Sequence, residues 1–335
     1  MIAYLRAKGH RVWFAGNRAQ NNFINETFPA IDTIYLEGYN VRYAAAPSLF
    51  MPVIIKQVPS LLGKIKREHA WLKETAGRYK IDLVISDNRY GLYHDHIPSV
   101  ILTHQLNIIT GMGAVADNML RRLHYKFLGR FADTWVVDIP QSPGLGGRLS
   151  HPVTLPPGAQ YIGLLSQAEH KPAKGTGYLL ILLSGPEPQR TLLADKLWEQ
   201  AKLHRGKVVF VEGSNGVPER KDIPQHITSH KQVVGDRLAE VLSGADMVVC
   251  RSGYSTLMDL VKLGKKAILI PTPGQTEQEY LAKELYEQKV FIRKAQQSFN
   301  LADAMEEAIN FPFRKMQFED AFEHFKAIVD SWLNE

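Results

Sequence analysis

The sequence predicts an α/β protein with two doubly wound, Rossmann-like domains that face a cleft. Short β-branched runs recur along the 335 residues, each followed by turn residues and a helical pattern. This alternation is typical of βαβ units. Runs such as Leu179–Leu183 are apolar throughout, as expected for central strands of a parallel sheet covered on both faces. The length itself favours about two domains.

The predicted strands form two series. In the first half they are 11–15, 33–36, 82–86, 99–103 and 134–138. In the second half they are 178–183, 207–212, 231–234, 246–250, 267–271 and 290–293. Between the series, Ser, Pro, Lys and Gly collect without periodicity. We therefore predict a first domain over 1–163, a linker over 164–177 and a second domain over 178–335. Whether the last helix returns to the first domain is left open.

The N-terminus departs from this plan. Residues 2–8 read as the last turns of a helix that Gly9 caps, and the first strand begins at Arg11. A doubly wound domain normally opens with a strand and a phosphate-facing loop. We expect that the chain as given starts inside its first domain, without that strand and its glycine-rich loop.

Composition and charge narrow the class of protein. Apolar residues make up 45% and charged residues 22%, which is ordinary for a globular protein. The single cysteine, Cys250, excludes an intrachain disulfide and favours a reducing, cytoplasmic setting. Residues 1–165 hold 18 basic and 11 acidic residues, so the net charge of +6 comes from the first half. An anionic partner is expected there, and a solvated basic surface is the alternative.

The segment with the most candidate ligand-binding groups follows the predicted strand 246–250. Residues 251–256 (Arg-Ser-Gly-Tyr-Ser-Thr) form a small-residue loop that opens a helix. The free N–H groups and dipole of a helix N-terminus favour a phosphate, and Ser252, Ser255 and Thr256 add hydroxyl donors. Asp259, about one turn further, can accept hydrogen bonds from ribose hydroxyls. The alternative is a Ser/Thr-capped helix with a surface Asp.

A second polar loop, Pro271–Glu279, follows the next strand, and Ser184–Gln189 follows the first strand of this domain. The carboxyl ends of parallel strands meet at one edge of the sheet. Loops that converge in this way favour a ligand site over isolated helix caps.

These segments resemble family 28 glycosyltransferases. Cys-Arg-Ser-Gly at 250–253, followed six residues later by an acid, is similar to the family's nucleotide-sugar loop, and residues 271–279 look like its donor-sugar loop. The resemblance is good over 178–290 and looser over 80–165. It implies the GT-B architecture of two α/β domains. The second domain would hold a UDP-sugar donor, and the first domain would hold the acceptor.

The resemblance also implies roles for individual residues. The diphosphate would lie against the helix start at Ser252, Gly253, Tyr254, Ser255 and Thr256 and near the loop with Ser184, Gly185 and Gln189. Arg251 would belong to the same donor site. Asp259, where the type member of the family has Glu, would meet the ribose. The base would lie near the main chain from Val234 to Leu238, and the sugar would meet Gln278 and Glu279. Gln275 would belong to the same donor site. The sequence holds no Asp-x-Asp motif, and we expect neither a metal nor a cofactor besides the UDP-sugar co-substrate.

Two polar residues end strands of the first domain. His104 is a candidate general base for an acceptor hydroxyl, because imidazole titrates near neutral pH, and Asp87 is a second candidate. A hydrogen-bonded strand-end histidine and a loop-capping aspartate are the alternatives. His94-Asp95-His96 lacks a third metal ligand at suitable spacing. Residues 111–116 match a dinucleotide-binding fingerprint only loosely.

Two stretches of the basic half are candidates for contact with an anionic membrane. Residues 49–62 mix large apolar residues with Lys56, and 118–130 read as a basic amphipathic helix. The alternative is that their apolar faces belong to the core. Nucleic acid is not expected as a partner, because no recognised nucleic-acid-binding module is present.

The family resemblance, together with the basic first half, implies a cytoplasmic glycosyltransferase, for which the inner face of the cytoplasmic membrane is a candidate location. It would move N-acetylglucosamine or a related hexose from a UDP-sugar to an unidentified acceptor, for which a lipid-linked molecule is a candidate. A nucleotide-sugar hydrolase, which releases sugar without an acceptor, and a 2-epimerase, which converts the donor sugar, are alternatives on the same scaffold. A non-catalytic nucleotide-sugar-binding subunit is a further alternative, and it would bind the donor without turnover.

Overall fold

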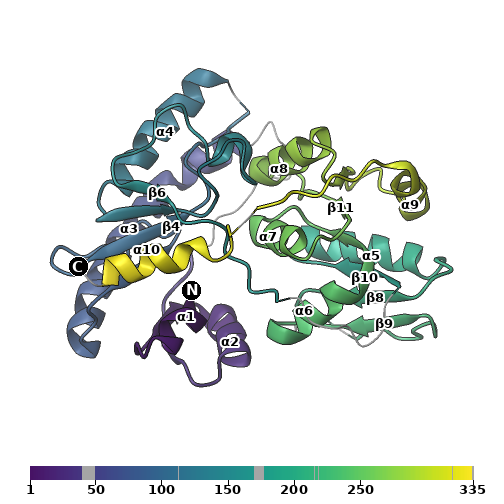
Figure 1. The fold of residues 1–335 in the computed structure, drawn as a ribbon, viewed down its shortest axis with the longest axis horizontal. Coiled ribbons are helices and arrows are strands. Elements are labelled where there is room, and N and C mark those ends of the chain that lie inside the picture. Colours follow the sequence, from purple (N-terminus) through teal and green to yellow (C-terminus); the bar gives the residue numbers. More distant parts are fainter. Residues whose placement is uncertain are drawn as a thin grey trace. The chain divides into compact units, whose positions relative to one another are not determined.

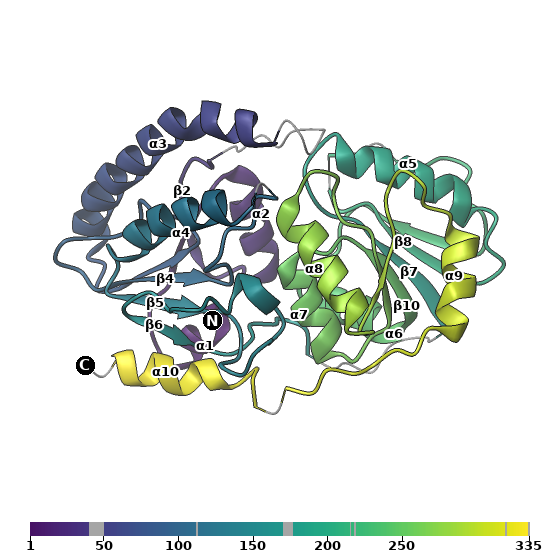
Figure 2. The same cartoon turned by 90° about the horizontal axis from the view of Figure 1, so that it is seen from above.

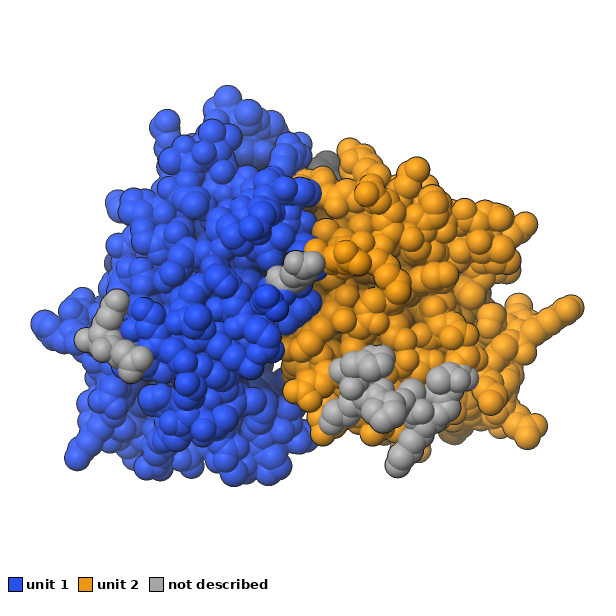
Figure 3. All heavy atoms as spheres, in the orientation of Figure 1, with its two compact units in different colours: residues 1–165, 318–335 blue, residues 166–317 orange. Residues whose placement is uncertain are grey.

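The structure is a computed structural model that describes residues 1–39, 50–111, 113–169, 177–214, 216–217, 219–318 and 320–333, with the side chains of 50–56 and 58 left out. The chain divides into two compact units (Figure 3). Unit 1 comprises Met1–Leu165 and Phe318–Glu335, and unit 2 comprises Ser166–Gln317. The division after Leu165 lies close to the predicted start of the linker at 164. The carboxyl-terminal segment belongs to unit 1.

The strands of unit 1 form two parallel sheets. The smaller sheet pairs β1 (Trp13–Gly16) with β2 (Asp32–Tyr35). The larger sheet runs in the order β3 (Val84–Asp87), β4 (Ser99–Thr103), β5 (Asp133–Val136) and β6 (Ala159–Tyr161). Within the described ranges the two sheets share no strand pairing. Every residue of β4 is buried, as its position inside the sheet requires.

Helices surround these sheets. They are α1 (Ile2–Ala7), α2 (Arg18–Thr27), α3 (Phe50–Tyr79), α4 (Ala114–Leu128), α10 (His324–Leu333) and the short 3₁₀ turn Gly147–Leu149. The predicted helix at the N-terminus is therefore present. In Figure 1, α10 lies beside α1, and the Tyr4 hydroxyl donates to Asp330 at 2.6 Å. Trp332 also packs edge-on against Trp135 of β5.

Unit 2 contains one six-stranded, fully parallel sheet. Its order is β12-β11-β10-β7-β8-β9, which is the doubly wound order. The strands are β7 (Tyr178–Leu182), β8 (Val208–Val211), β9 (Ile227–His230), β10 (Ala245–Cys250), β11 (Ala267–Leu269) and β12 (Ile292–Arg293). The winding direction reverses between β7 and β10, where Leu182 stands opposite Cys250.

Helices cover both faces of this sheet. They are α5 (Gln189–Ala201), α6 (Gly235–Gly244), α7 (Tyr254–Lys262), α8 (Thr276–Glu287) and α9 (Leu301–Asn310). Figure 2 shows α7 and α8 on one side of β7, β8 and β10, and α9 on the other. Helices α5 and α9 share a core with the strands, in which Leu197, Phe210 and Ile268 are fully buried. Because central strands are apolar on both faces, they need this double cover.

Two edge strands differ from the sequence prediction. The strand predicted at 231–234 is wrong, because the chain forms β9 earlier, at Ile227–His230. Strand β6 was not predicted. Both are edge strands with mixed or intermediate burial, so the continuous apolar run that marks a central strand is missing from them.

Candidate active site

The reversal point between β7 and β10 brings two of the predicted donor loops together. In doubly wound sheets, ligands bind at the carboxyl ends of the strands where the winding direction reverses. The loop after β7 begins at Ser184 and Gly185, and the loop after β10 begins at Arg251. Because Leu182 and Cys250 are register partners, these loops leave the sheet side by side.

Helix α7 begins directly after β10. Gly253 is its N-cap, and no side chain caps the helix. Tyr254 is buried in the core, Ser255 is exposed and Thr256 is half-buried. The helix N-terminus therefore combines backbone N–H donors with one exposed hydroxyl, a combination that suits an anionic ligand.

Arg251 points into the protein. Its Nη1 donates to the carbonyl oxygens of Ile270 and Pro271 at 3.1 and 3.2 Å, and its Nη2 donates to that of Gln189 at 2.8 Å. The residue is 1% exposed, and burial lowers the pKa of its guanidinium to about 10. Arg251 thus joins the loops of β10 and β11 to the start of α5, and its guanidinium faces carbonyl oxygens of the protein.

Ser252 is fully buried, and its hydroxyl donates to the Gln278 carbonyl at 2.8 Å. This bond joins the start of α7 to α8. Since the hydroxyl is committed to this bond, Ser252 is placed as a structural link between two predicted donor loops.

The loop between β11 and α8 is held by the predicted sugar-binding side chains themselves. Gln278 Oε1 accepts from the Thr272 N–H at 2.9 Å, and Glu279 Oε1 accepts from the Gly274 N–H at 3.0 Å. Gln275 is the N-cap of α8. All three predicted residues lie together at one helix start, and they are half-buried.

The loop after β7 is exposed at Ser184 and Gly185. Gly185 has φ +102, a conformation that L side chains rarely adopt. Gln189 lies at the start of α5, where its side chain accepts from Gln296 at 3.0 Å. Behind this loop, Gly213 packs so closely on the Leu183 carbonyl that a Cβ would clash with it.

Val234 and Asp259 lie apart from the loops that follow β7, β10 and β11. Val234 is the N-cap of α6, after β9, two strands from β7 in the sheet. Asp259 is 6% exposed, and its carboxylate accepts from the Ser166 hydroxyl at 2.6 Å. The structure therefore places Asp259 against the segment with which unit 2 begins.

In unit 1, Asp87 and His104 lie at the same edge of the sheet. Asp87 ends β3, and His104 directly follows β4, the neighbouring strand. Although Asp87 retains open surface, desolvation by the surrounding protein raises the pKa of its carboxyl, and the nearby His104 opposes this shift. The two predicted catalytic residues are thus close enough to interact electrostatically.

The sequence reasoning missed two buried polar residues at this edge. Asp138, after β5, is fully buried and accepts from the N–H groups of Ile139, Leu145 and Gly146 and from the Ser150 hydroxyl. Its predicted strand end and the following Pro- and Gly-rich stretch were the available signal. His124 in α4 is 3% exposed, and burial lowers the pKa of its imidazole to about 4.

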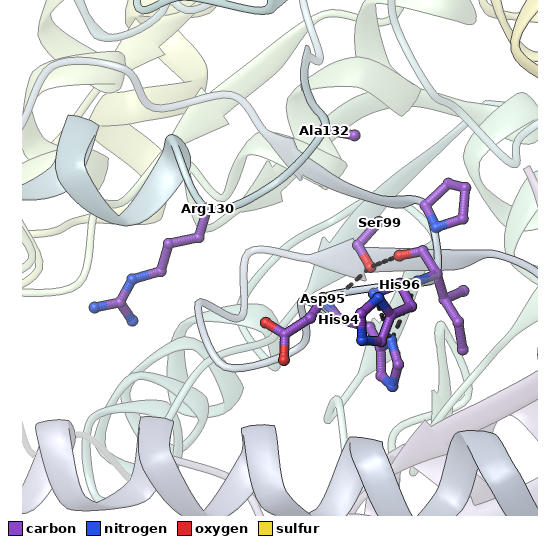
Figure 4. Close-up of a pocket in the computed structure, with 8 residues that line it drawn as sticks. His94, Asp95, His96, Ser99, Arg130 and Ala132 are labelled. Carbon is purple, nitrogen blue, oxygen red and sulfur yellow. Dashed lines mark hydrogen bonds between the residues drawn. The ribbon is translucent and has the colours of Figure 1, made fainter.

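The His94-Asp95-His96 motif lines a pocket of about 280 Å³ at the amino end of β4. Figure 4 shows Arg130 pointing away from the histidines. His94 Nδ1 accepts from the His96 and Ile97 N–H groups. Over the described residues, no group of three or more His, Cys, Asp or Glu side chains is arranged to hold a metal ion.

Comparisons with known proteins agree with this arrangement. Residues 191–330 match the Glycosyltransferase family 28 C-terminal domain. This stretch takes in most of unit 2 and most of the carboxyl-terminal segment. Over 280 residues the chain is 25% identical to a UDP-N-acetylglucosamine–N-acetylmuramyl-(pentapeptide) pyrophosphoryl-undecaprenol N-acetylglucosamine transferase from Microcystis aeruginosa. The match covers 82% of this chain and 71% of the relative.

Two solved structures are similar along almost the whole chain. The glycosyltransferase SnogD from Streptomyces nogalater has a TM-score of 0.63 at 13% identity, covering 99% of this chain and 93% of its own. The spinosyn rhamnosyltransferase SpnG, complexed with thymidine diphosphate, has a TM-score of 0.62 at 13% identity, covering 99% and 94%. The predicted fold class, GT-B with two Rossmann-like domains, is confirmed, and the protein is a glycosyltransferase.

Proposed function

We propose that this glycosyltransferase transfers N-acetylglucosamine or a related hexose from a UDP-sugar to a lipid-linked acceptor. The observation that carries the proposal is the convergence of the loops after β7 and β10 at the reversal point of the unit 2 sheet. There the uncapped N-terminus of α7 and the exposed Ser255 hydroxyl offer donors for a diphosphate. The Microcystis aeruginosa relative is named for the same sugar and for a lipid-linked acceptor.

The proposed reaction is a displacement at the sugar's anomeric carbon. The acceptor oxygen forms a bond to that carbon while the bond to the diphosphate oxygen breaks. The helix N-terminus stabilises the charge that develops on the leaving UDP. The acceptor proton passes to a base, for which Asp87 and His104 of unit 1 are the candidates. The raised pKa of Asp87 makes its carboxylate a better proton acceptor than an ordinary aspartate.

Calorimetric titration with UDP, with GDP and ADP as controls, tests the donor site. We expect UDP to bind and Ser255→Tyr to abolish binding, because the new ring would cover the start of α7. Leu203→Tyr is the matched control, since Leu203 is 83% exposed just past the carboxyl end of α5. Wild-type protein that binds none of the nucleotides would contradict the proposal. Sugar release without an acceptor at the rate of transfer would favour the hydrolase instead.

The proposed acceptor requires access to a membrane surface, and α4 offers one. We define the α4 surface as the apolar residues Val115, Met119, Leu123, Val153 and Leu155 together with the basic residues Arg122, Lys126 and Arg130. Val115, Met119 and Leu123 are 86, 72 and 42% exposed. The Tyr125 hydroxyl donates to the Thr154 carbonyl at 3.0 Å and so holds the 153–155 loop beside the helix. Apolar residues rimmed by cations suit an anionic bilayer.

Neither a membrane-spanning helix within the described residues nor the side chains at 50–56 add evidence for this contact. None of the helices in the described ranges has the length and hydropathy needed to cross a bilayer. Leu49, and the side chains at 50–56 and 58 in the other predicted membrane stretch, lie outside the described residues. The α4 surface is therefore the part of the membrane proposal that contacts and exposure support.

Co-sedimentation with vesicles of phosphatidylglycerol and phosphatidylcholine tests the surface. We expect binding to anionic vesicles only, and a roughly hundredfold loss for the double variant Val115→Ser, Met119→Ser, since each of the two buried apolar side chains contributes about 1.5 kcal/mol or more. The double variant Leu203→Ser, Ile309→Ser is the control, because those residues are 83 and 81% exposed in unit 2. Equal losses in both variants would contradict the assignment.

A further inference from the structure

Three strands at the reversal point of the unit 2 sheet end in register. Leu182 of β7 stands opposite Cys250 of β10, which in turn stands opposite Leu269 of β11. Because the strands are parallel, their loops leave the sheet in the same direction. Three residues beyond the shared row, these loops reach corresponding positions, which are Gly185, Gly253 and Thr272.

The Thr272 hydroxyl is buried and unpaired. The residue is 2% exposed, and no polar group in the described part of the chain hydrogen-bonds to its Oγ1. Its main chain is held on both sides, since its N–H donates to Gln278 Oε1 at 2.9 Å and its carbonyl accepts from the Gln275 N–H at 3.0 Å. A buried hydroxyl without a partner costs free energy that a valine of the same shape would not. The hydroxyl therefore points to a partner from outside the chain.

Gly185 leaves this hydroxyl within reach of a ligand. Among the described residues, and apart from the chain neighbours of Gly185, a Cβ placed there would meet one atom within 4 Å, the Thr272 Oγ1 at 3.7 Å. Gly185 itself is exposed, so a ligand atom can take up this position from solvent. At Gly253, the N-cap of α7, a Cβ would meet nothing within 4 Å. The two glycines thus allow a ligand to approach the main chain closely.

The charge beside these loops favours an anionic ligand. The buried guanidinium of Arg251 donates to the carbonyl oxygens of Ile270 and Pro271, directly before Thr272, and to that of Gln189. These partners are neutral and do not cancel its charge. The positive end of the α7 dipole lies at the same edge of the sheet. A buried charge usually has a counter-charge, which a diphosphate would supply.

We propose that the Thr272 hydroxyl donates a hydrogen bond to the diphosphate of the donor, in the space beside Gly185. The inference rests on the proposed function in taking the reversal point as the donor site. It adds to the diphosphate contacts a residue from the loop that the sequence assigns to the sugar. Pro271 and Pro273 restrict the backbone around Thr272, and its branched side chain restricts χ1. The hydroxyl is therefore held in place before the ligand binds, which favours affinity.

Urea unfolding of Thr272→Val tests whether the hydroxyl is unpaired in the free protein. We expect the unfolding midpoint to equal or exceed that of the wild type, because the variant loses no hydrogen bond. Ser252→Ala is the matched control in the same unit. The Ser252 hydroxyl is also buried but donates to the Gln278 carbonyl at 2.8 Å, so its midpoint should fall. A fall of the same size in Thr272→Val would overturn the proposal.

Calorimetric titration with inorganic pyrophosphate and with UDP tests the ligand. We expect Thr272→Val to bind both about tenfold more weakly, as for the loss of one hydrogen bond to a charged phosphate. Thr272→Ser keeps the hydroxyl and should bind both about as tightly as the wild type. Unchanged affinity of Thr272→Val for both ligands would overturn the proposal. So would a loss confined to UDP-N-acetylglucosamine, which would place the hydroxyl on the sugar.

The two ligands also separate this inference from the proposed function. Wild-type protein that binds pyrophosphate but not UDP would contradict the proposed function, and the pyrophosphate affinity of Thr272→Val would still decide the role of Thr272. Wild-type protein that binds neither would contradict both.

Discussion

The Ser252 hydroxyl donates to the main-chain carbonyl of Gln278 at 2.8 Å and so ties the start of α7 to the first turn of α8. Both residues belong to loops that the sequence assigns to the donor. This hydrogen bond stabilises the folded protein, because a buried hydroxyl donates to a partner within the protein. Residues at the surface of the same loops remain for the ligand.

Ser252 and Ser255 are expected to respond differently to truncation. Ser252→Ala removes a buried hydrogen bond and should lower the free energy of unfolding by about 1–2 kcal/mol. Ser255→Ala changes an exposed hydroxyl and should alter stability by less than about 0.5 kcal/mol. It should nevertheless weaken UDP binding about tenfold, as expected for one hydrogen bond to a charged phosphate. Urea unfolding and calorimetry measure the two effects, and a reversed pattern would contradict the assignment.

Arg251 should matter for stability far more than an exposed arginine. Arg251→Met leaves the carbonyl oxygens of Ile270, Pro271 and Gln189 without their donor and should cost about 3 kcal/mol or more. Arg205→Met, at an exposed position, is the control and should cost less than about 0.5 kcal/mol. Thermal unfolding of both variants gives the comparison. Equal stability of the two variants would show that the buried guanidinium is dispensable.

Gly213 should tolerate no side chain. A Cβ there would clash with the Leu183 carbonyl, and φ is +76, so Gly213→Ala should cost about 2–4 kcal/mol and shift the adjacent Ser184 loop. Gly264→Ala separates strain from crowding. Gly264 has φ +60 with nothing within 4 Å of the added atom, so only the backbone strain of about 1–2 kcal/mol is expected. Similar losses at both positions would argue against crowding at Gly213.

His124 should make unit 1 sensitive to acid. Its pKa is lowered from 6.5 to about 4 by burial, so the unfolded chain takes up a proton at this residue before the folded protein does. Its contribution to stability is full above pH 6.5 and declines as pH falls toward 4. Between pH 7 and 4.5 this amounts to about 2–3 kcal/mol.

Urea unfolding followed by tryptophan fluorescence measures this effect, because Trp13, Trp71, Trp135 and Trp332 lie in unit 1. His124→Gln has no titrating group and should lose less stability than the wild type over the same interval. Parallel curves for wild type and variant would show that His124 does not titrate as described.

The central strands and the main loops of this protein follow from local sequence. Runs such as Leu179–Leu183 and Met247–Cys250 are apolar on both faces, a pattern that only a covered parallel sheet accommodates. The polar residues that directly follow those strands must lie at the carboxyl edge, because parallel strands share their direction. The edge strands β6 and β9 were not predicted, because partly exposed strands lack the continuous apolar run that marks a central strand.

Tertiary structure decided which polar side chains face the protein and which face solvent. Ser252 and Ser255 have the same chemistry and lie three residues apart, yet one is buried against Gln278 and the other is exposed. The Ser166 hydroxyl donates to the Asp259 carboxylate, a contact between residues 93 positions apart that the motif around Asp259 does not indicate. Local sequence determines strand and helix positions through short-range sterics and burial periodicity. The partner of a polar group depends on residues distant in the chain, which only the folded arrangement brings within hydrogen-bond distance.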